Sequence, residues 1–167
     1  MGVGYSMRGC VVDGVVLFFI QGGVSLILYV IFCSKKEKKE GIFIPSAPIP
    51  FSFATAISQG VMSTLIVCGF VTYFSCILAL CHHLFGSTAS LIFSLFLEVS
   101  HGCQATVGHP LGLPLTAFAI GFSGISVHLQ VANIANQTQL SLTPYLLLKC
   151  LGGVLGFLFA YIYVIFS

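Results

Sequence analysis

Long apolar stretches separated by short polar segments dominate the chain. They run over residues 11–33, 60–84 and 144–166. A helix needs about 20 consecutive apolar residues to cross a bilayer, so each of these stretches predicts a full membrane span. The pattern therefore predicts an all-α, polytopic integral membrane protein with about three full spans.

Two further apolar segments are too short or too interrupted for a regular span. Residues 87–103 have a short apolar core that runs into a polar cluster, and residues 115–135 are interrupted by the run Gly-Phe-Ser-Gly. Irregular backbone at membrane depth occurs only where protein or a water-filled cavity covers it. We therefore expect a short or re-entrant helix at 87–103 and a broken helix at 115–135, within a single membrane domain over 1–167.

Composition and charge strengthen this interpretation. Charged residues make up 6% of the chain, hydrophobic residues 57%, and the mean hydropathy is +1.08. This is far too little charge for a soluble domain, and there is no basic surface for nucleic acid. The partner implied is the lipid bilayer. Six of the ten charged side chains lie in residues 35–40, which predicts a cytoplasmic loop over 34–50 and an N-terminus outside.

The polar cluster after residue 97 is the first candidate for chemistry. Glu98 is the acid placed deepest in an apolar segment, and Ser100 and His101 follow it closely. Ionisable groups in membranes are costly and usually face a cavity or a partner, so Glu98 is a candidate substrate or proton site. The alternative is a helix-terminal carboxyl near the interface. With Cys103 and His109 the cluster also suggests a metal, but the spacing matches no zinc pattern, so no metal site is predicted.

The second candidate is the interruption at Gly121, Ser123 and Gly124. Glycines on both sides of a serine allow a helix to unwind locally. Discontinuous helices at the bilayer midplane are how many transporters hold anionic substrates. Glycines also serve tight helix packing, so the alternative is a purely structural role.

Polar side chains near this interruption extend the candidate site. Ser126 and Gln130 share a helix face at i, i+4, whereas His128 points elsewhere and is either a packing residue or a ligand. Lys149 lies near the start of the last span. It either extends to the interface or pairs with Glu98 or an anionic substrate.

Three blocks of this sequence resemble a known family. Residues 96–103, 121–131 and 142–149 match, in order and spacing, the C-terminal part of YlbJ-type sporulation integral membrane proteins, which carry a gate or nucleoside-recognition type of membrane domain. Family members are longer and have a further N-terminal membrane half. The resemblance therefore implies that the chain corresponds to the C-terminal half of a longer transporter.

The resemblance implies a function in endospore formation. The chain would be a transport component for a small anionic metabolite, with dipicolinate suggested, in the bacterial cell membrane or the membrane surrounding the forespore. A separate N-terminal half or a homo-oligomer would be its protein partner. The alternatives are an accessory or assembly protein without a substrate and a metal-ion permease of the gate-domain type. No nucleophile–base pair or metalloprotease motif predicts an enzyme, and no cofactor is implied.

Overall fold

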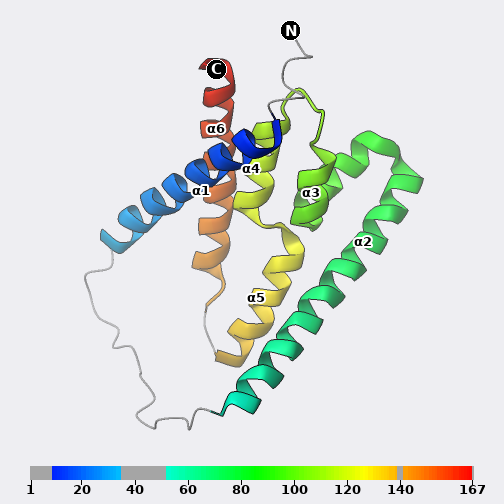
Figure 1. Cartoon of the computed structure of the whole chain (residues 1–167), viewed down its shortest axis with the longest axis vertical. Helices are drawn as coiled ribbons and strands as arrows, with labels where there is room; N and C mark the ends of the chain where they lie inside the picture. The colour runs from blue at the N-terminus through cyan, green and yellow to red at the C-terminus, as the bar shows by residue number, and fades with distance from the viewer. Residues whose placement is uncertain (1–8, 35–51, 139–140, 167) are drawn as a thin grey trace.

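The computed structural model describes residues 9–34, 52–138 and 141–166, and within these residues every secondary-structure element is an α-helix. Figure 1 shows them in order: α1 (Gly9–Ser34), α2 (Phe53–Leu97), α3 (Val99–Ala105), α4 (Gly112–Phe122), α5 (Gly124–Thr138) and α6 (Thr143–Phe166). Four stretches are long and apolar enough to cross a membrane: Val12–Phe32, Phe53–Leu97, Gly112–Asn133 and Thr143–Phe166. The expectation of an all-α polytopic membrane protein is confirmed.

The centre of the molecule is the contact between α4 and α6, which α1 crosses (Figure 1). Ala117 of α4 and Ala160 of α6 are almost fully buried here, and side chains of α1 such as Leu17 and Ile20 pack against them. Gly156 of α6 faces the backbone of Ala117, and a Cβ built on Gly156 would lie 3.1 Å from the Ala117 carbonyl oxygen. Small residues thus let the two helix backbones approach closely.

The long helix α2 bends at Gly86, where the backbone adopts φ 80° and ψ −177°. A left-handed φ of this kind is readily available to glycine. After the bend, the chain runs back toward α4 and reaches α3 (Figure 1). The short helix expected over 87–103 is therefore the last part of α2 plus α3, with a break at Glu98 between them. This is the broken geometry that the polar cluster predicted.

Large apolar side chains cover the outer faces of α1 and α2. Phe18 and Phe53 are both more than 70% exposed, and Leu65 and Leu80 are also largely exposed. Surfaces of this kind are stable in contact with lipid chains rather than with water. The exposure is therefore what a membrane-spanning bundle requires.

Two boundaries differ from the sequence expectations. The second span does not start at residue 60, because α2 begins at Phe53. The broken helix expected over 115–135 also extends further, because α5 ends at Thr138. In both places, helix propagation from the adjacent apolar turns outweighs a few polar residues. The expected loop over 34–50 lies, apart from Ser34, outside the described residues.

Candidate functional site

The interruption between α4 and α5 is a true backbone break. Ser123 adopts the left-handed conformation with φ 72°, and Gly124 follows with φ 70°. Among the described residues, Ser123 is the one non-glycine residue with a positive φ. Its N–H donates to the Ala119 carbonyl oxygen (2.8 Å) and its hydroxyl to the Ile120 carbonyl oxygen (3.1 Å). These bonds close the end of α4, so that α5 starts as a new helix.

The second break, at Glu98, lies directly against the first. Glu98 is extended, with φ −145° and ψ 124°, and its backbone touches the position of Gly124. A Cβ on Gly124 would lie 3.1 Å from the Leu97 carbonyl oxygen and 3.3 Å from the Glu98 Cα. The positive φ and this close approach both favour glycine at position 124. The two candidate segments found in the sequence are therefore one structural unit.

The carboxylate of Glu98 begins the short helix α3. Its Oε2 accepts a hydrogen bond from the backbone N–H of His101 (2.8 Å) and lies 3.1 Å from Nδ1 of the same residue. Glu98 is only 1% exposed. A carboxylate that accepts from the first turn of a helix is a capping residue, so the buried acid has a local structural partner. Glu98 is therefore a helix-terminal carboxyl, as the alternative expectation had it, but it is buried within the protein.

Lys149 of α6 reaches the first break. Its ammonium Nζ donates a hydrogen bond to the hydroxyl of Ser123 over 2.8 Å. The backbones of α4 and α6 meet just beside this bond, where a Cβ on Gly121 would lie 2.7 Å from the Gly152 carbonyl oxygen. The glycines therefore let the lysine of one helix reach the break of the other.

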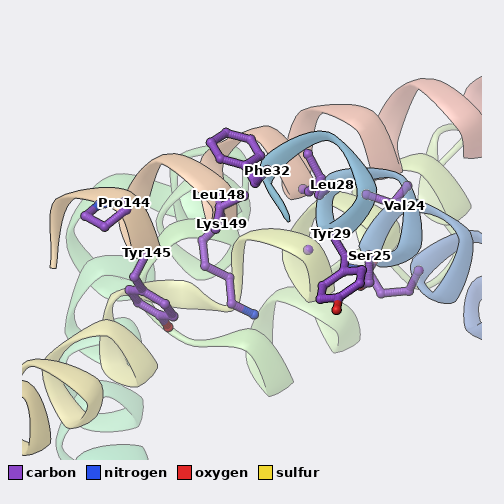
Figure 2. Close-up of a pocket in the computed structure, with 12 residues that line it drawn as sticks. Val24, Ser25, Leu28, Tyr29, Phe32, Pro144, Tyr145, Leu148 and Lys149 are labelled. Carbon is purple, nitrogen blue, oxygen red and sulfur yellow. The ribbon is translucent and has the colours of Figure 1, made fainter. Parts of the chain in front are cut away.

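A cavity of about 680 Å³ opens beside this lysine, between α1 and α6. Figure 2 shows the amine of Lys149 directed into the space between Tyr145 of α6 and Tyr29 of α1. Gly121 forms part of the wall at the α4 end. The cavity has one cationic and no acidic side chain among the residues that line it. Its chemistry therefore favours a negatively charged or strongly polar ligand.

The α1 wall of the cavity was missed in the sequence. Gln21, Ser25 and Tyr29 follow one another at intervals of four residues and all line the cavity. Residues spaced by four lie on one face of a helix. A polar stripe of this kind within an otherwise apolar span was the signal available in the sequence.

Two other predicted residues lie on α5, next to the cavity wall. The ring of His128 packs edge-on against Phe122 and Tyr145, and its Nδ1 lies 3.3 Å from the Tyr145 hydroxyl. Ser126 is 1% exposed. The hydroxyl of Ser126 and Nε2 of His128 are buried without a hydrogen-bond partner among the described residues. His128 thus contacts a cavity residue but does not line the cavity itself.

The remaining predicted residues do not join this cavity. Ser100 is exposed, Gln130 is half-buried on α5, and His101 lines a different, smaller cavity. The pairing of Lys149 with Glu98, one of the alternatives for this lysine, is not found: Lys149 bonds Ser123, and Glu98 bonds His101. The reason is geometric, because the carboxylate faces α3, whereas Lys149 approaches from α6.

The part of the chain that the structure describes contains no group of three or more His, Cys, Asp or Glu side chains that could hold a metal ion. His101 and Cys103 are therefore not joined there by a third such ligand. The metal-permease alternative gains no support from these residues.

The fold and the site define an all-α polytopic membrane protein with two helix breaks in contact at its centre. The chain matches no protein-family model, and no curated protein or solved structure shows significant similarity to it. Function must therefore be inferred from the chemistry of the site.

Proposed function

We propose that this chain is a component of a membrane transporter for a small anionic metabolite. The observation that carries the proposal is the hydrogen bond from Lys149 to Ser123, because Lys149 both reaches a helix break and lines a cavity of about 680 Å³. Helix breaks beside cavities at membrane depth are typical substrate sites of transporters. A lysine whose partner is a neutral hydroxyl keeps its positive charge available for an anion.

The dimensions and polarity of the cavity support a small organic anion. Ligand pockets usually measure about 300–1,000 Å³ and combine apolar walls with a few polar groups. Here Leu28, Phe32 and Leu148 supply apolar surface, while Tyr145 and Ser25 supply hydroxyls. An aromatic or compact carboxylate would satisfy both kinds of wall.

The resemblance to sporulation membrane proteins suggests which anion. It favours dipicolinate, a planar aromatic dicarboxylate, and a role in the membrane surrounding the forespore. Because the family members have a second membrane half, we propose a component that works with a separate half or a second copy, rather than a complete transporter.

The direct test is uptake of radiolabelled dipicolinate by liposomes that contain the purified chain, alone and with any partner that co-purifies. Lys149→Met removes the charge and should reduce apparent affinity about tenfold or more, because hydrogen bonds to charged groups contribute about 1.5–3 kcal/mol. Lys149→Arg should retain part of the activity. Thr64→Val is the matched control, since Thr64 is exposed on α2 and bonds only within its own helix.

A test in sporulating cells separates transport from assembly. A strain that lacks the gene should form dipicolinate-poor spores, which the wild type and Thr64→Val rescue and Lys149→Met does not. Normal dipicolinate in the deletion strain would contradict the proposal. Equal rescue by Lys149→Met and the wild type would instead favour the accessory or assembly role, which does not need the lysine.

A further inference from the structure

A second cavity, of about 370 Å³, is lined by both parts of α2, before and after the bend at Gly86, and by the short helix α3. It is not part of the Lys149 site, and six of its nine lining residues are polar. The polar residues that line it are Ser75, His82, Ser90, Ser94, His101 and Gln104. Polar walls of this kind can hold water at membrane depth, and protons move along such water molecules.

His101 lines this cavity, and Glu98, which does not line it, contacts His101 from the buried side. The side chain of His101 is 40% exposed and that of Glu98 only 2%, and His101 Nδ1 lies 3.1 Å from Glu98 Oε2. A proton that arrives from the cavity therefore meets the imidazole first. Imidazole is the side chain best suited to exchange protons near neutral pH. The carboxylate of Glu98 lies directly behind it, within hydrogen-bond distance of Nδ1.

Few other titratable groups surround the pair. Of the titratable side chains of α2, His82 lines the same cavity, and Cys103 lies on α3 itself, half-buried. The neighbouring α4 has no titratable side chain. On α5, His128 is turned toward Phe122 and Tyr145 instead. The proton balance of this region thus depends mainly on Glu98 and His101, with His82 at the cavity wall.

The pair is mechanically linked to the anion site. A Cβ at Gly124 would lie only 3.1–3.3 Å from backbone atoms of Leu97, Glu98 and Val99, so the two breaks are in close backbone contact. Gly124 directly follows Ser123, which holds Lys149. A conformational change in the first turn of α3, which Glu98 caps, must therefore either move Gly124 or be opposed by its contact with Gly124. Two sites that bias the same packed element influence each other's affinity reciprocally.

We propose that Glu98 and His101 form the proton-binding site that couples anion transport to a proton gradient. The proton reaches His101 through the second cavity, is held between the imidazole and the carboxylate, and crosses the membrane together with the anion held at Lys149. The step is a proton transfer: an O–H bond of a hydronium ion breaks as the N–H bond of the imidazole forms, and release on the other side reverses it. The inference rests on the proposed transport function and adds its energy source.

The experiment uses liposomes that contain the chain, with any partner that co-purifies, and radiolabelled dipicolinate, with the membrane potential clamped by potassium and valinomycin. Uptake is measured with equal pH on both sides and with the lumen one pH unit more alkaline. Coupling of one proton per anion should raise accumulation about tenfold, because one pH unit is a tenfold ratio of proton activity. A pH-sensitive dye inside the liposomes should report acidification that depends on dipicolinate.

Variants that remove one titratable group at a time test which residues couple proton movement to transport. Glu98→Gln and His101→Gln should lose gradient-driven accumulation and the associated proton flux, but still exchange labelled for unlabelled dipicolinate at a reduced rate. Exchange activity shows that a variant is folded. If Glu98→Gln does not fold, the result for His101→Gln alone tests the proposal. His83→Gln is the matched control, since His83 is exposed on the same helix as His82 and lines neither cavity.

The outcomes separate the two proposals. If the wild type shows saturable uptake that does not depend on the pH gradient, proton coupling is wrong, whereas the proposal of anion transport is retained. Gradient-driven accumulation that persists in both glutamine variants would overturn the assignment to Glu98 and His101. Absence of any uptake or exchange above protein-free liposomes would overturn the proposed function, and this inference with it.

Discussion

Gly124 at the start of α5 lies against the carbonyl group of Leu97 at the end of α2. A Cβ on Gly124 would be 3.1 Å from that oxygen and 3.2 Å from the backbone nitrogen of Val99. The contact joins two helix breaks that are 25 residues apart in the sequence, from Glu98 to Ser123. It explains how the short polar cluster after residue 97 and the Gly-Phe-Ser-Gly interruption form one site.

Gly124→Ala should destabilise the protein strongly. The new methyl group meets backbone atoms that cannot move aside independently, and a left-handed φ of 70° is unfavourable for alanine. Together these effects should cost about 2–4 kcal/mol. The measurement is thermal unfolding of the detergent-solubilised protein, followed by circular dichroism.

Gly23→Ala is the control for that experiment. Gly23 is helical in α1, and no atom lies within 4 Å of a Cβ built on it. Alanine should be neutral or slightly stabilising there, because it has the higher helix propensity. Equal melting temperatures of both variants would show that the contact between the breaks does not hold the fold together.

Gly121→Ala should separate α4 from α6. The Cβ would lie 2.7 Å from the Gly152 carbonyl oxygen and 2.8 Å from the Gly153 Cα, all of it backbone. Overpacking of this kind costs about 1–3 kcal/mol. Because Lys149 reaches Ser123 from across this contact, dipicolinate affinity should fall together with stability. A variant with an unchanged melting temperature would contradict the close approach of the two helices.

Much of this arrangement could be predicted from the sequence, because membrane spans and helix breaks have local signals. Apolar length predicted the spans, and the residues around Ser123 predicted the interruption that the structure shows. The glycines of the last span lie at its close contact with α4, but this partner could not be identified from the sequence. A single span carries no information about which neighbour it packs against.

The site itself depended on long-range contacts and was predicted only in part. Glu98 and Lys149 were each singled out as ionisable groups in apolar surroundings, but their partners turned out to be His101 and Ser123 rather than each other. The polar stripe of α1 belonged to the site as well, and its four-residue spacing was visible in the sequence. Only the crossing of α1 over α6 shows why those positions are polar.

Ser123→Gly should separate the backbone role of this residue from its chemical role. Glycine adopts a φ of 72° without strain, so stability should be unchanged or slightly higher. The hydroxyl that positions Lys149 is lost, however, so the affinity for dipicolinate should fall. Unfolding and equilibrium binding are measured on the same preparation. A large loss of stability would show that the hydroxyl, rather than the backbone, maintains the break.

Glu98→Ala and Glu98→Gln should differ in stability. Alanine removes the acceptor for the His101 N–H, which begins α3, and loss of a helix cap costs about 0.5–2 kcal/mol. Glutamine keeps an acceptor oxygen of similar reach and should unfold close to the wild type. One kcal/mol corresponds to roughly 2–4 °C in melting temperature for a chain of this size. If glutamine were as damaging as alanine, the negative charge of Glu98, rather than the cap hydrogen bond, would be what holds the α2/α3 break.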